Sequence, residues 1–180
     1  MLLMGLREAP LGEALSKRSR ERMNTKQVIQ SQYLAALAML RQAIEKCPEA
    51  VWYDTNEKFK IWSKAYHTVF FVHFYLQDAE QDFVPWEKHH DPDGDLPFTK
   101  DEVLEYLTFA RQQVLERVPV TDLDAESGFH WYPVNKLELQ FINIRHIQQH
   151  TGELYECLGI RENMEDLRWV GYNKRYSDLT

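Results

Sequence analysis

Apolar residues recur every three or four positions between residues 25 and 47, which predicts a first amphipathic helix. Either Asn24 or Thr25 supplies its N-cap, and Pro48 lies just beyond its end. The residues expected to face the core are Ile29, Tyr33, Leu37, Leu40 and Ile44.

The second predicted helix, from about Glu57 to Phe83, is apolar almost all round in its middle. This pattern is typical of a helix that packs on several sides. Pro85 ends the helix, and a loop continues to residue 98, with Asp-Pro-Asp-Gly-Asp at 91–95 supplying turn residues.

Polar capping residues mark the third helix. Thr99 and Glu102 have the spacing of a capping box, so we expect the helix to begin there and to run to about Val118. A second long loop, residues 119–133, follows it.

The fourth predicted helix begins at the cap residue Asn135 and runs to about Leu158, with Gly159 in the C′ position. From Glu162 onward we expect one short helix and then an irregular end. Four helices joined by two connections of about 15 residues predict an all-α fold, a four-helix bundle with long interhelical connections. Loops of that length often border a functional site.

Composition narrows the class of protein. A chain of 180 residues fits one domain, and its net charge of −7 excludes the basic face that nucleic-acid binding needs. No apolar run approaches the roughly 20 residues needed to cross a bilayer. Cys47 and Cys157 are far apart and indicate neither a disulfide framework nor a thiolate zinc site. We expect a cytoplasmic protein with neither nucleic acid nor a membrane as partner.

The N-terminal segment has a different character from the rest of the chain. Residues 1–22 carry five basic and three acidic side chains, a net charge of +2, whereas the remaining chain has a net charge of −9. We therefore expect a disordered extension at 1–22 and a single helical domain at 23–180.

The most informative chemistry is a pair of histidines, His146 and His150, in the fourth predicted helix. Their spacing of four residues places both imidazoles on one face, one turn apart. Leu139, Ile142 and Leu154 share that face, so we expect the pair to point into the protein and away from water. Two buried neutral imidazoles are costly unless their ring nitrogens are satisfied, and a divalent metal would do this. The pair therefore predicts a metal site inside a helical bundle.

Two ligands make a weak site, so a third histidine should come from another helix. The second predicted helix offers His67 and His73. These residues are six positions apart, which places them about 120° apart around the helix, so they do not readily face the same metal. Periodicity alone leaves both candidates open.

The segment Arg145-His146-x-x-x-His150-x-Gly152-Glu153-Leu154, together with a histidine in the second helix, resembles the DinB/YfiT-like four-helix bundle superfamily. In that family the helix-two ligand typically lies eight residues after an aromatic residue, and Phe59 and His67 have this spacing. The resemblance covers roughly residues 25–158 and implies the ligand triad His67, His146 and His150, with His73 as the fallback.

This sequence departs from the family pattern at two positions. Gln149 stands where many members have a second adjacent histidine, and Phe59 replaces the usual tryptophan. Neither departure removes a ligand. The resemblance further implies a divalent metal, most often nickel or zinc, and a homodimer. Some members are thiol-dependent transferases or isomerases that use low-molecular-weight thiols.

Glu153 lies three residues after His150 on nearly the same face. It is our candidate catalytic residue, as a proton acceptor, although it could instead orient a ligand or be an ordinary surface glutamate. The first functional hypothesis is a metal-dependent enzyme, a thiol transferase or hydrolase, with Tyr66 or Trp131 lining its pocket. The alternatives are a non-catalytic metal-binding or small-ligand-binding protein and a bundle with purely structural histidines.

Three other patterns have simpler explanations. Glu87-x-x-His90 matches half of a di-iron motif, but it stands alone in a loop. Asp91, Asp93, Asp95 and Glu102 match a calcium loop, but Leu96 occupies the position of the turn glycine. The aromatic run 129–132 could wall a substrate pocket, although packing over the end of the bundle is the commoner role.

Overall fold

The computed structural model describes residues 24–54, 60–90 and 96–173. Within these residues the fold is all-α, as predicted, with four long helices and one short one. The long helices are α1 (Thr25–Lys46), α3 (Ile61–Tyr75), α4 (Lys100–Arg117) and α5 (Lys136–Glu162), and the short helix is α2 (Glu49–Trp52). The expected extension at 1–22 lies outside the described residues and stays a prediction.

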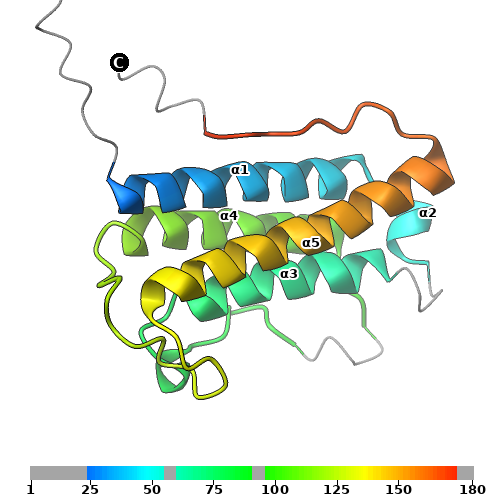
Figure 1. Ribbon diagram of the computed structural model, residues 1–180. Helices are drawn as coiled ribbons and strands as arrows, with labels where there is room; N and C mark the ends of the chain where they lie inside the picture. The colour runs from blue at the N-terminus through cyan, green and yellow to red at the C-terminus, as the bar shows by residue number, and fades with distance from the viewer. Residues whose placement is uncertain (1–23, 55–59, 91–95, 174–180) are drawn as a thin grey trace, which may run out of the picture.

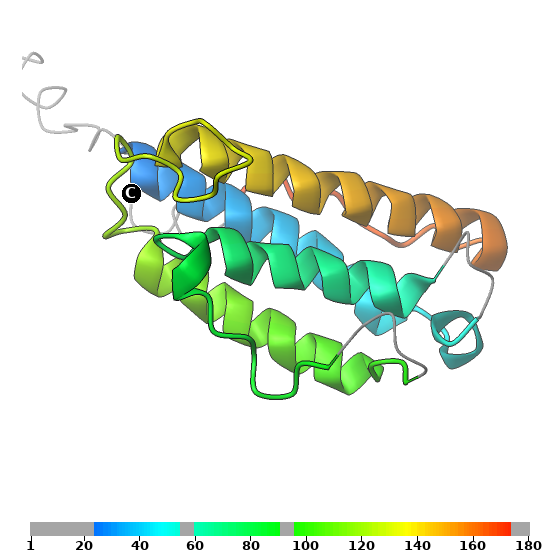
Figure 2. The same ribbon diagram turned by 90° about the horizontal axis from the view of Figure 1, so that it is seen from below.

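The four long helices form a bundle in which each contacts two neighbours (Figures 1 and 2). Helices α1 and α3 each pack against both α4 and α5. Helices α1 and α5 run in one direction, and α3 and α4 run in the other (Figure 1). Because α3 and α4 are parallel neighbours, the segment between them must return along the length of the bundle, which accounts for the long connection at 76–99.

Capping and burial explain why the helices begin and pack where they do. Asn24 and Thr99 each form a capping box, with Gln27 and Glu102 respectively. The Asn135 side chain caps α5 at the amide of Glu138. The five core positions predicted for α1 are all buried. No helix in the described part of the chain is long and apolar enough to span a membrane.

The second long helix is shorter than predicted. It ends at Tyr75, not at Phe83, and residues 80–82 form a separate 3-10 turn. The chain turns here because Lys136 of α5, although 5% exposed, donates to the carbonyl oxygens of Gln77, Asp78 and Ser127 at 2.7, 2.7 and 2.6 Å. The ammonium group thereby fixes the end of α3 to the loop before α5.

The last long helix continues further than predicted. Helix α5 runs to Glu162, and Asn163 ends it in the left-handed conformation with φ of 50°. Gly159 lies inside the helix, so its expected C′ role is wrong. Asparagine adopts this conformation more readily than most residues, which is why it can stop the helix here.

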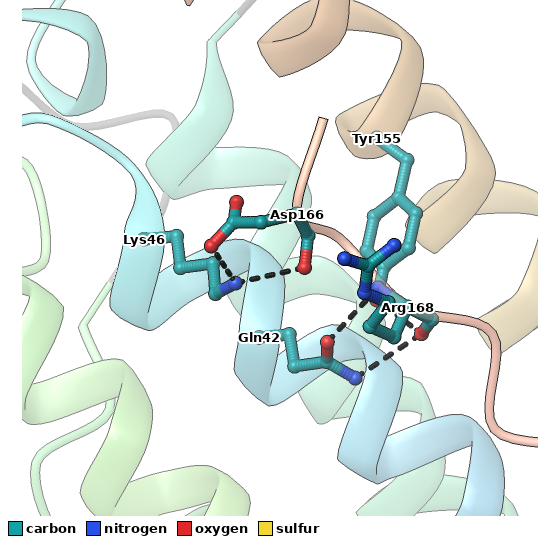
Figure 3. A network of polar contacts seen from close by, with 5 residues as sticks. All are labelled: Gln42, Lys46, Tyr155, Asp166 and Arg168. Atoms are coloured by element: carbon teal, nitrogen blue, oxygen red, sulfur yellow. Dashed lines mark hydrogen bonds and ion pairs between the residues drawn. The ribbon is translucent and has the colours of Figure 1, made fainter. Parts of the chain in front are cut away.

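The chain after α5 also differs from the prediction, because residues 163–173 form no helix. The segment lies along α1 in an irregular path (Figure 3). Gln42 both accepts from the backbone N–H of Arg168 at 3.1 Å and donates to its carbonyl oxygen at 3.2 Å. Lys46 contacts the carbonyl and the carboxylate of Asp166. Side chains of the bundle thus satisfy backbone groups that a helix would have paired internally.

The interface between α3 and α4 contains a buried histidine among aromatic rings. His73 is 4% exposed, and its Nδ1 lies 3.1 Å from the hydroxyl of Tyr106. Its ring also packs against Phe83 and Phe109. Burial, with a smaller contribution from the charge of Arg117, lowers the pKa of His73 to about 4, so the ring is neutral at pH 7.

We predict opposite effects of alanine at two glycines. Gly159→Ala should raise the free energy of unfolding by about 0.5–1 kcal/mol, because the new Cβ meets nothing within 4 Å in a helix interior. Gly128→Ala should lower it by more than about 1 kcal/mol, because Gly128 has φ of +81° and a Cβ there would lie 2.2 Å from the carbonyl oxygen of Asp78. Urea denaturation measures both, and a destabilising Gly159→Ala would show that α5 ends earlier.

We predict that His73 makes the protein acid-sensitive. Between the ordinary histidine pKa of about 6.5 and the folded pKa of about 4, the unfolded chain binds more protons than the folded one. Stability should therefore fall as pH drops through this window. In His73→Gln the fall should be shallower by up to about 1.4 kcal/mol per pH unit. Urea unfolding of chelator-treated protein from pH 7 to pH 4 measures the difference, and equal slopes would contradict the prediction.

Candidate metal centre

Three histidines meet where α3 packs against α5. Helix α3 supplies His67, and α5 supplies His146 and His150. One ring nitrogen of each lies within 4.8 Å of the other two. The Nε2 atoms of His67 and His146 are 3.1 Å apart. The structure therefore brings together the three residues of the expected triad.

The structure separates the two candidate histidines of α3. His67 lies on the face that meets α5, with its ring centroid 5.1 Å from that of His146 and 5.0 Å from that of His150. His73 lies on the face that meets α4, against Tyr106. The rotation of about 120° between them directs the two rings to different neighbours, so His67 alone joins the pair.

The histidine pair is less buried than expected. The buried stripe of α5 runs through Asn143, Ile147, Thr151 and Leu154. His146 and His150 flank this stripe and are half-buried, and His67 is exposed. The expectation that the pair points into the interior is met only in part: the Nδ1 of His146 is buried and the His150 side chain is 18% exposed, but both rings lie beside the buried stripe and not within it. The site opens to solvent along the edge of the α3–α5 contact.

Hydrogen bonds leave the Nε2 of His150 available for a metal. Its Nδ1 donates to the Oε2 of Glu153 at 3.1 Å. In a neutral imidazole this donor role places the remaining lone pair on Nε2. A carboxylate that accepts from the second nitrogen of a histidine is the usual support of a metal-ligating imidazole.

The protonation state of His146 fits a ligand, but among the described residues its second ring nitrogen lacks the support that Glu153 gives to His150. The Nδ1 of His146 is buried and has no hydrogen-bond partner among the described residues. Burial, followed by the proximity of His150 and His67, lowers the pKa of His146 to about 4. The pKa of His67 is also lowered, first by burial and then by His150. Both rings are therefore neutral at pH 7, the state in which imidazole binds metal.

Glu153 is fully ionised at neutral pH. Its Oε2 accepts from Lys64 at 2.6 Å as well as from His150. Burial raises the pKa of this carboxyl group, but hydrogen bonds from Lys64, His150 and Gln149 outweigh burial and bring the pKa to about 2. A carboxylate with so low a pKa is a weak base, so this geometry favours the orienting role over proton acceptance.

Two hollows lie beside the histidines. One, of about 720 Å³, is bordered by Tyr132, Ile142, Arg145 and His146, among others. The other, of about 310 Å³, lies near Glu153 at the far end of the same helix pair. Its lining residues include Lys60, Ile61, Lys64, Cys157 and Arg161.

The aromatic residues expected at the pocket are elsewhere. Tyr66 is 1% exposed and stacks on Phe98 at 3.9 Å between centroids, on the α4 side of α3. Trp131 packs on Phe74 and donates to the hydroxyl of Tyr75 at 3.4 Å, at the end of the bundle. The ring that does contact the histidines is that of Phe71, with its centroid 4.7 Å from that of His67 and 5.3 Å from that of His146.

Sequence reasoning places Phe71 on the face of His67, but it missed Lys64 as a neighbour of the site. Both fall at helical spacing from His67, four residues after it and three before it. This spacing predicts that both side chains lie next to His67. It identifies them as neighbours of the metal site only when His67 is known to be the histidine that meets α5.

The other patterns do not join the site. Among the described residues no other set of three His, Cys, Asp or Glu side chains has metal-binding geometry. His90 of the E-x-x-H pattern stacks on Phe98, and Glu102 of the calcium pattern belongs to the Thr99 capping box. Asp91, Asp93 and Asp95 lie outside the described residues.

Comparison with known protein families matches residues 32–154 to the DinB superfamily. Searches of the curated proteins and of the solved structures found no match. The matched range includes all three clustered histidines and covers more than half of the chain. The all-helical bundle agrees with it. The chain therefore belongs to the DinB superfamily.

Proposed function

We propose that this protein binds one divalent metal ion through His67, His146 and His150 and uses it to activate a thiol or water for group transfer or hydrolysis. The observation that carries the proposal is the convergence of three imidazoles, with one nitrogen of each within 4.8 Å of the others. Nickel or zinc is the proposed ion, and a low-molecular-weight thiol is the proposed substrate. The homodimer and the cytoplasmic location stay predictions.

The spacing of the ring nitrogens of His67 and His146 fits two ligands of one ion. Two nitrogens that each lie about 2.0–2.1 Å from a zinc ion are about 2.8–3.4 Å apart for angles between about 90° and 109°. The Nε2 atoms of His67 and His146, at 3.1 Å, fall within this interval. Without an ion, one of these two Nε2 atoms must carry a proton and donate it to the other, so that the two neutral rings form a single hydrogen bond.

The chemistry of the donor set fits a catalytic ion. Three neutral imidazoles leave the charge of a divalent ion uncompensated, and that charge lowers the pKa of a thiol or water held at the site. The half-open position of His67 and His150 at the edge of the helix contact allows a small substrate to approach. The ring of Phe71 excludes water from one side of His67 and His146.

Within this proposal Glu153 is a positioning residue. It holds His150 in the tautomer that presents Nε2, and Lys64 holds the carboxylate in turn. A proton acceptor for the reaction must then come from the substrate or from solvent, because the carboxylate with a pKa of about 2 is too weak a base.

Metal content tests the ligand set. After purification and reloading with zinc or nickel, the wild-type protein should hold one ion per chain. His67→Ala, His146→Ala and His150→Ala should each lose most of it, whereas His130→Ala, which removes an exposed histidine paired with Glu80, should keep it. Full metal stoichiometry in any of the three variants would refute that residue as a ligand.

A change at Glu153 tests the positioning role. Glu153→Gln should weaken metal affinity by about 10- to 100-fold, the usual effect of removing a partner of a ligating histidine. Glu156→Gln, an exposed glutamate on the same helix, is the matched control and should leave affinity unchanged. A competition titration with a chromogenic chelator measures both. Equal affinity in wild type and Glu153→Gln would remove Glu153 from the site.

A turnover assay separates an enzyme from a metal-binding protein. The loaded protein is mixed with a panel of small thiols and electrophilic acceptors, and conjugation is followed with and without a chelator. Metal-dependent turnover that disappears in His146→Ala supports the proposed enzyme. Full metal binding without turnover across the panel supports the non-catalytic alternative.

A further inference from the structure

A further cavity lies on the opposite side of α3 from the three histidines. Its volume is about 500 Å³, within the range of small-molecule sites. The C-terminal halves of α3 and α4 and the segment 82–87 enclose it. It contains His73, the histidine that the metal centre does not use.

One part of the cavity is apolar. Phe109, which is 36% exposed, meets the ring of His73 edge-on at 4.9 Å between centroids. Trp86 stacks on Tyr106 at 4.6 Å and is 7% exposed. Val84 is 73% exposed at the border. These side chains offer an apolar surface to a ligand that enters between them.

The other part of the cavity presents the guanidinium of Arg117, which has no ion-pair partner among the described residues. Arg117 is half-buried, and its Nε donates to the Oε1 of Gln113 at 2.7 Å, which fixes the guanidinium plane. The two terminal nitrogens of a guanidinium match the two oxygens of a carboxylate.

The remaining polar groups restrict the charge of the ligand. The Nδ1 of His73 lies against the Tyr106 hydroxyl, and the ring, which lines the cavity, is neutral at pH 7. Asp82 and Glu87, both exposed, border the opening. One cation beside two rim carboxylates accepts a monoanion better than a dianion.

We propose that this cavity binds a small monocarboxylate with an apolar body, with the carboxylate on Arg117 and the apolar body against Phe109, Trp86 and Val84. Such a site is separate from the metal centre, because α3 lies between them. The inference goes beyond the proposed metal-dependent function and does not depend on it.

Benzoate is a suitable probe because it carries one carboxylate on an apolar ring. Calorimetric titration of the full-length protein should show saturable binding of benzoate, whereas benzyl alcohol and the dianion phthalate should bind at least tenfold more weakly. All titrations are repeated in His146→Ala, which should bind benzoate as well as the wild type. Loss of binding in that variant would place the carboxylate at the metal and overturn the proposal.

Variants of Arg117 locate the probe. Arg117→Ala should weaken benzoate binding by about 10- to 100-fold, because a charge-assisted hydrogen-bonded pair is lost. Arg111→Ala, on the same helix but outside the cavity, is the matched control and should bind normally. If Arg117→Ala does not fold, Arg117→Lys should fold and bind more weakly than the wild type. Equal binding of benzoate and benzyl alcohol to the wild type, or unchanged binding in the Arg117 variants, would overturn the proposal.

Discussion

The antiparallel packing of α3 against α5 is the constraint on which the candidate centre depends. It brings His67 to a pair of histidines that are 79 and 83 residues further along the chain. The same contact aligns Lys64 with Glu153 one turn away, so the partner of His150 is itself held from the opposite helix. Because both helices are rigid elements, three imidazoles can converge without help from a loop.

Helix α3 has three faces with different surroundings, and this explains its composition. One face meets α5 and carries His67, another meets α4 and carries His73, and the residues between them fill the core. An apolar helix with histidines on two faces is therefore expected to show weak periodicity. That is why the spacing of residues alone left the two histidines open as candidates, whereas the packing assigns each to one neighbour.

Much of the architecture follows from local signals in the sequence. The helix starts at residues 25, 100 and 136 were predicted because Asn24, Thr99 and Asn135 bind backbone amides of their own first turn. The helix ends at Tyr75 and Glu162 do not follow from the local sequence, because contacts between residues far apart in the chain determine them. Lys136 donates hydrogen bonds to two carbonyl oxygens just beyond the end of α3. Side chains of α1 bind the backbone of the chain beyond α5.

The candidate site also combines features that local sequence spacing predicts with features that helix packing determines. The spacing of four residues between His146 and His150 predicts that they share a helix face, and Glu153 lies about one turn after His150. The exposure of the histidines does not follow from their spacing, because neighbouring helices determine which face of α5 is covered.

The most direct test of the central claim is the X-ray absorption spectrum of the zinc- or nickel-loaded protein. Three imidazole ligands that fall to two in His67→Ala would confirm it, and an unchanged set of ligands in that variant, or sulfur among them, would contradict it.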